Sequence, residues 1–99
     1  MALFSFFKTK QWNKDPQQHQ LATLLGEAAV FAVRSDDAQR YKKEAEIIKF
    51  LSRNGWRKGE AGDRIVHACS MVKIAGSPKV YQEAKNIGEA LYISLGKAW

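Results

Sequence analysis

Short polar and glycine-containing breaks divide this sequence into segments whose apolar residues are spaced as on one face of an α-helix. Within each segment these residues recur at intervals of three and four, which predicts amphipathic helices. Without the first break, a single helix would run over residues 17–54, which is implausibly long for so small a domain. The breaks are Ser35-Asp36-Asp37, Asn54-Gly55 and Gly76-Ser77-Pro78.

The first two predicted helices have recognisable starts. Asp15 is a candidate N-cap for a helix that runs to about residue 34. Pro16 takes the first position of this helix, where the N–H that proline lacks would have no partner within the helix. Asp36 with Gln39 has the form of a capping box for the second helix, which ends at the Asn-Gly step. We expect one side of this second helix to face the core. That side carries Tyr41, Ala45, Ile47, Ile48 and Leu51.

The second half of the chain predicts two more helices. A short loop over residues 56–59 precedes a helix over residues 60–75. Ser77 then caps a fourth helix that starts with Pro78 and keeps helical apolar spacing as far as Leu95.

The last of these helices has one alternative. Residues 80–84 and 90–95 would also serve as two strands of a hairpin, which would make the fold a winged helix-turn-helix. The helix is favoured because Ile87 and Leu91 fit its spacing without a turn.

The length of the chain leaves room for one domain only, because folding at about 100 residues buries about two thirds of the unfolded surface. Of the 99 residues, 45% are hydrophobic and 26% are charged, which is ordinary usage for a globular domain. We therefore expect a compact all-α domain of four helices over residues 17–99, preceded by an aromatic and basic arm over residues 1–16.

The arm combines aromatic side chains with lysines. Such a segment either folds back to complete a small core or docks into a partner, and the pattern does not separate these outcomes. The tryptophan at the other end of the chain presents the same alternatives. As partner anchors, the candidates are Phe4, Phe6, Phe7, Trp12 and Trp99.

Half of the formal net charge of +6 falls within residues 35–58, which cover the second helix and the loop after it. A positive loop with an aromatic side chain is suited to grip phosphates or to steer the chain toward an acidic protein. The other interpretation is that the tryptophan covers the edge of the core while the cations are solvated. The candidate contacts for nucleic acid or an acidic partner are Lys42, Lys43, Arg53, Trp56, Arg57, Lys58 and Arg64.

The residue types present argue against several functions. The single cysteine, Cys69, and two histidines cannot form an internal disulfide or a closed four-ligand zinc site. Asp63, His67 and Ser70 share a helix face, but their spacing does not assemble a hydrolytic triad. We expect no catalytic residue, cofactor or metal site. The chain also has no recognisable signal peptide and no apolar run of the ~20 residues that a membrane span needs, which favours the cytoplasm.

Residues 28–51 resemble the tellurite-resistance TerB-like helical domains. The resemblance rests on an alanine-rich helix, the acidic step after it, Glu44 and the apolar stretch 47–51. It implies divalent-metal ligands at Asp36, Asp37 and Glu44, since hard cations bind convergent oxygens. Helix capping by Asp36 is the other interpretation, and it is the one adopted here.

Together these features predict a small non-catalytic regulator that acts on nucleic acid or a nucleoprotein complex through the basic loop. The alternative is a protein-binding module or inhibitor that docks on its partner through exposed aromatic side chains. Binding that falls steeply with salt would favour the first, and loss of a partner on deletion of the arm would favour the second.

Overall fold

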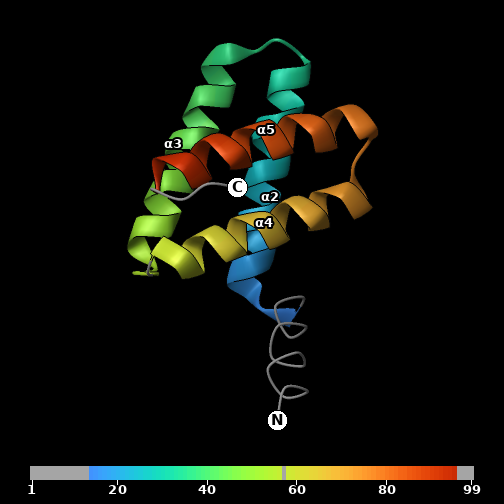
Figure 1. The fold of residues 1–99 in the computed structure, drawn as a ribbon. Coiled ribbons are helices and arrows are strands. Elements are labelled where there is room, and N and C mark those ends of the chain that lie inside the picture. Colours follow the sequence, from blue (N-terminus) through green and yellow to red (C-terminus); the bar gives the residue numbers. More distant parts are fainter. Residues whose placement is uncertain (1–13, 57, 96–99) are drawn as a thin grey trace.

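The computed structural model describes residues 14–56 and 58–95 and consists there of four α-helices (Figure 1). This confirms the predicted all-α class. These ranges contain no strand, and the last helix continues through both segments of the alternative hairpin, so they do not form a winged helix-turn-helix. The helices are α2 (Pro16–Val33), α3 (Asp37–Arg53), α4 (Lys58–Ala75) and α5 (Pro78–Ser94).

The helix ends follow the chemistry of their capping residues. The side chains of Asp15, Asp36 and Ser77 each accept a backbone N–H of the following first turn, at 2.9, 3.3 and 3.3 Å. Each contact satisfies an amide that has no partner inside the helix. Gly55 takes the left-handed conformation after α3, with φ of 62°. Helix α4 begins at Lys58, two residues earlier than expected.

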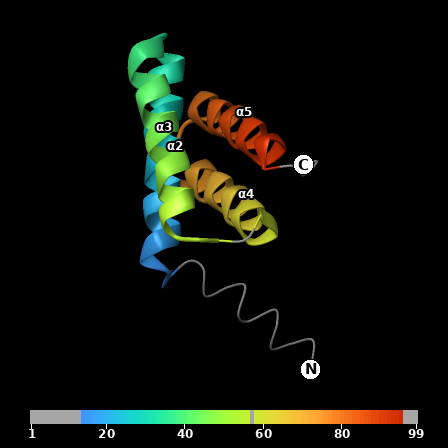
Figure 2. The same ribbon diagram turned by 90° about the vertical axis from the view of Figure 1, so that its left-hand side faces the viewer.

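The four helices form two antiparallel pairs that cross each other. Helices α2 and α3 make one pair, and α4 and α5 make the other (Figures 1 and 2). Helix α2 packs against all three other helices, whereas α3 packs chiefly against α2. The core therefore lies around α2.

Small residues on α2 allow the second pair to approach it closely. Ala28 and Ala29 are fully buried. Larger apolar side chains then fill the space between the four helices. They include Leu21, Leu25, Ile47, Phe50, Leu51, Ile65, Val72, Ile87 and Leu91.

The inward side of α3 differs from the expected one. Ile47 and Leu51 are buried as predicted, but Tyr41 and Ile48 are 59% and 56% exposed, and Ala45 is exposed as well. The prediction was wrong at these three positions because α3 packs chiefly against a single helix, α2. A helix that packs mainly on α2 needs only a narrow apolar stripe.

The predicted anchors Phe4, Phe6, Phe7, Trp12 and Trp99 lie outside the residues that the structure describes. Part of the charge excess lies outside them as well. All ten acidic residues are described, but Lys8, Lys10, Arg57 and Lys97 are not.

Within the described helices, none has the length and apolar character required to cross a membrane.

The close crossing at α2 gives a direct test of the fold. We expect Ala28→Leu to lower the free energy of unfolding by about 1–3 kcal/mol, because added methyl groups at a fully buried crossing must displace neighbouring helices. The matched change Ala90→Leu, at an exposed position of α5, should have little effect. Urea denaturation measures both. Equal stabilities of the two variants would contradict the crossing.

Candidate functional site

The structure separates the predicted basic region into two groups of side chains. Lys43, Trp56 and Arg64 make contacts within the domain, whereas Lys42 and Arg53 are exposed on α3. The remaining two candidates are not placed: Arg57 and the side chain of Lys58 lie outside the structural description.

Arg64 is held between three elements and is only 12% exposed. Its Nη1 donates to Oδ2 of Asp15 at 2.8 Å, and its Nε lies 3.8 Å from a carboxylate oxygen of Glu60. The guanidinium carbon also lies 4.1 Å from the centroid of the Trp56 ring, a cation–π contact. These contacts join the start of α2, helix α4 and the loop before α4.

Trp56 also makes its contacts within the domain. Besides its contact with Arg64, it meets Phe50 edge to face, with ring centroids 5.6 Å apart and planes at 79°. It is half-buried and packs against the core. This geometry supports the interpretation that the tryptophan covers the edge of the core, because stacking on a base would compete with Arg64 for the ring.

Gln18 is a structural residue that the sequence analysis missed. It is the one buried polar side chain among the described residues, and its Nε2 donates to the carbonyl oxygen of Arg64 at 2.8 Å. Its position three residues before Leu21 and seven before Leu25 places it on the apolar face of α2, and that spacing was an available signal. We call Asp15, Gln18, Trp56 and Arg64 the polar latch.

The polar latch changes the acidity of Asp15. Burial alone would raise the pKa of this carboxyl, but the hydrogen bonds from Arg64 and from the Gln17 backbone, with the charge of Arg64, outweigh burial and lower it. The ionised carboxylate is thus the form that the folded protein stabilises.

Lys43 joins α3 to α2. Its Nζ lies 3.2 Å from a carboxylate oxygen of Glu46 and 3.6 Å from one of Glu27. The hydrogen bond with Glu46 is the main reason why the pKa of Lys43 is raised, and both carboxylate charges add to it. Lys43 therefore carries a charge that is already paired within the domain.

The acidic residues of the TerB-like stretch are engaged in local contacts. Asp36 caps α3, and Arg40 lies 3.6 Å from both Asp37 and Glu44. In the described part of the chain, no group of three or more histidine, cysteine or acidic side chains is arranged to hold a metal ion.

The outer face of α3 carries two adjacent rows of exposed side chains. The basic row consists of Lys42, Lys49 and Arg53, spaced seven and four residues apart. None of these three cations forms an ion pair with another described residue. The apolar row consists of Tyr41, Ala45 and Ile48, spaced four and three apart. Both rows run along the helix because these spacings return to the same side of it.

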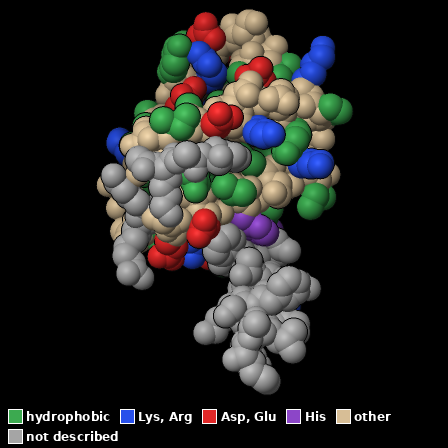
Figure 3. Space-filling model, viewed as in Figure 1, with side chains coloured by type: hydrophobic (Ala, Val, Ile, Leu, Met, Phe, Trp, Pro, Cys, Tyr) green, Lys and Arg blue, Asp and Glu red, His purple; other side chains and the backbone are tan. Residues whose placement is uncertain are grey.

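On the face formed by α4 and α5, basic and apolar side chains are not arranged in separate rows. In Figure 3, cationic, acidic and apolar side chains are interspersed over the visible described part of this face. The rows on α3 are therefore the stronger candidate for selective recognition of a charged partner.

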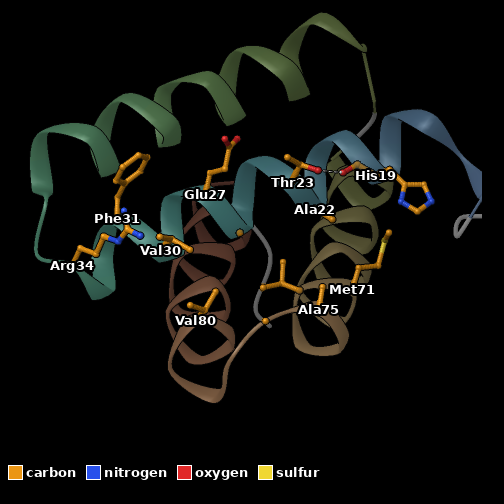
Figure 4. A pocket seen from close by; sticks show the side chains of 13 residues that line it. His19, Ala22, Thr23, Glu27, Val30, Phe31, Arg34, Met71, Ala75 and Val80 are labelled. Carbon is orange, nitrogen blue, oxygen red and sulfur yellow. Dashed lines mark hydrogen bonds between the residues drawn. The ribbon is translucent and has the colours of Figure 1, made fainter.

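A groove runs along another side of α2. It has a volume of about 570 Å³ and is bounded by α2, the end of α4 and the start of α5 (Figure 4). His19 lies at one end and Arg34 at the other. His67 of α4 lies near the first end, where burial and, secondarily, the charge of His19 lower its pKa.

Cys69 is buried. Its spacing of four and three residues from Ile65 and Val72 places it on the apolar face of α4. Burial raises the pKa of its thiol to about 12, and the sulfur donates to the carbonyl oxygen of Ala84 at 3.6 Å. At neutral pH the thiol stays protonated, so it is a poor nucleophile and metal ligand.

No protein-family model, curated protein or solved structure matches this chain.

Two substitutions at Asp15 separate the contributions of its helix cap and its ion pair to the free energy of unfolding. Asp15→Ser keeps a capping oxygen but removes the ion pair, and we expect the free energy of unfolding to fall by about 1 kcal/mol. Asp15→Ala removes the cap as well and should cost about 1 kcal/mol more. Chemical denaturation at neutral pH measures both losses, and a Ser variant as stable as the wild type would contradict the polar latch.

The stability of the wild type and that of Asp15→Ser should depend differently on pH. Because the pKa of Asp15 is lowered on folding, its stabilisation is complete above its ordinary pKa and is lost as pH falls through the lowered value. Between neutral pH and about pH 3, the wild type should therefore lose more stability than Asp15→Ser.

The histidine pair can be tested by titration. We expect His19→Gln to raise the pKa of His67 but to leave it below its ordinary value, because burial is the larger cause of the shift. Nuclear magnetic resonance of the His67 ring protons measures this. An unchanged pKa would show that the two imidazoles do not interact.

Proposed function

We propose that this protein is a small non-catalytic binding module that recognises an acidic amphipathic helix of a partner protein through the outer face of α3. The observation that carries the proposal is the basic row beside the apolar row. Apolar contact provides affinity, and the cations select the partner and guide its approach.

The apolar row supports a helical partner. Tyr41, Ala45 and Ile48 follow the alternating spacing of four and three residues that forms the seam between two packed helices. Helix α3 has 17 residues, so it offers about 25 Å of length to a partner helix. Because α3 packs chiefly on α2, this side of the helix remains exposed in the described domain.

The basic row supports an acidic partner. Lys42 and Lys49 each follow an apolar-row residue, Tyr41 and Ile48, and therefore flank the same side of the seam. In two-stranded helical packing, flanking charges determine which partner is accepted. Carboxylates on the facing helix would pair with these lysines, whereas a second copy of α3 would place lysines near lysines in an antiparallel pairing.

The polar latch argues against nucleic acid as the main ligand of this region. Arg64 and Trp56 are engaged with Asp15 and Phe50, so neither is free for a phosphate or a base without breaking a contact within the domain. An apolar row also contributes nothing to phosphate binding, which depends on positive charge.

A charge exchange tests the proposal. The probe is a synthetic helical peptide with leucines along its seam and glutamates beside them, and its control has lysines in place of the glutamates. We expect the wild type to bind the glutamate peptide more tightly, with an affinity that falls as salt rises. Lys42→Glu with Lys49→Glu should weaken that complex about tenfold and reverse the preference. Calorimetric titration measures the affinities.

Two further variants test whether binding depends on α3. Lys14→Glu with Lys79→Glu makes the same change in net charge at exposed positions outside α3 and should bind like the wild type. Ile48→Ser should weaken the binding of the glutamate peptide through loss of apolar contact. Equal binding of both peptides, or oligonucleotide binding that needs the lysines but not Ile48, would overturn the proposal.

A further inference from the structure

The groove along α2 is independent of the face proposed for the partner helix. Its lining residues come from α2, the end of α4, the following turn and the start of α5, and none comes from α3. On α2 the lining runs from His19 to Arg34, which is about 22 Å of helix length. The groove is thus elongated, and α2 forms one complete wall of it (Figure 4).

Apolar and small residues make up the middle of the groove. Ala22 and Val30 line it from α2, Met71 and Ala75 from α4, and Val80 from α5 (Figure 4). Gly76 supports the turn between α4 and α5, since a Cβ there would lie 2.9 Å from the carbonyl oxygen of Val72. A volume of about 570 Å³ with this lining falls in the range of small-molecule sites, roughly 300–1,000 Å³.

One end of the groove carries a positive charge. Arg34 lines this end beside Val30 and Phe31 and forms no ion pair with any described residue. A guanidinium at the C-terminal end of α2 is favoured by the helix dipole, but that interaction leaves its donors able to bind a carboxylate.

Glu27 is the one carboxylate that lines the groove, and its position decides whether the groove can accommodate a bound anion. Its side chain turns toward α3 (Figure 4), where its carboxylate lies 3.6 Å from Nζ of Lys43. Glu27 is also two helical turns from Arg34, or about 10 Å. The negative charge is therefore partly neutralised and lies away from the cationic end.

We propose that this groove binds an amphipathic anion, namely a single apolar chain that ends in a carboxylate. The carboxylate pairs with Arg34, and the chain follows α2 over Val30 and Ala22 toward Met71. A single chain fits this volume better than a peptide helix, whose diameter with side chains is about 10–12 Å. The proposal does not depend on the recognition of an acidic helix by α3.

The test compares two ligands that differ only in the head group. Calorimetric titration of the full chain uses dodecanoate and dodecanol, both as monomers in solution. We expect the wild type to bind dodecanoate about tenfold more tightly than dodecanol, because one charge-assisted interaction is added. Arg34→Gln should remove this difference and leave the binding of dodecanol unchanged.

Two further variants locate the apolar chain. Ala75→Trp places a large ring in the groove from an exposed position and should abolish the binding of both ligands, and circular dichroism checks that the variant is folded. Lys14→Gln removes one positive charge at an exposed position outside the groove and should bind both ligands as the wild type does. Failure of the wild type to bind dodecanoate, or an equal affinity for both ligands, would overturn the proposal whatever the outcome on α3.

Discussion

The packing of α2 against three other helices is the constraint on which the rest of the structure depends. Its buried alanines allow α4 and α5 to cross closely on one side, while α3 occupies another. Both candidate binding surfaces follow from this arrangement. The groove forms beside the crossing, and the outer face of α3 remains exposed because its packing surface is almost entirely on α2.

The same packing decides which charges remain available to a partner. The polar latch uses Arg64 to join the start of α2 to α4, and Lys43 connects α3 to α2 through Glu27. The charge of Arg64, which is only 12% exposed, is costly to remove, because its partner Asp15 then loses its compensation. Among the cations that stay exposed, Lys42, Lys49 and Arg53 form a short row on α3. Their position beside apolar side chains is what favours a protein partner over a nucleic acid.

The helices and their ends could be predicted because their signals are local. The caps at Asp15, Asp36 and Ser77 involve residues two or three positions away, and the burial of Cys69 followed from helical spacing. The contacts of Arg64 with Asp15 and Gln18 could not be predicted in this way, because they join residues 49 and 46 positions apart. The exposed side of α3 was missed for a related reason, since the number of helices that pack on it depends on the tertiary arrangement.

The most direct test of this account is a nuclear magnetic resonance titration of the full chain with the glutamate peptide. We predict that the largest changes in amide chemical shift occur in α3, around Tyr41, Ile48 and Lys49, and that the signals of the polar latch and the groove change little. Changes centred on Trp56 and Arg64, or on the groove around Met71 and Val80, with α3 unaffected, would contradict recognition through the outer face of α3.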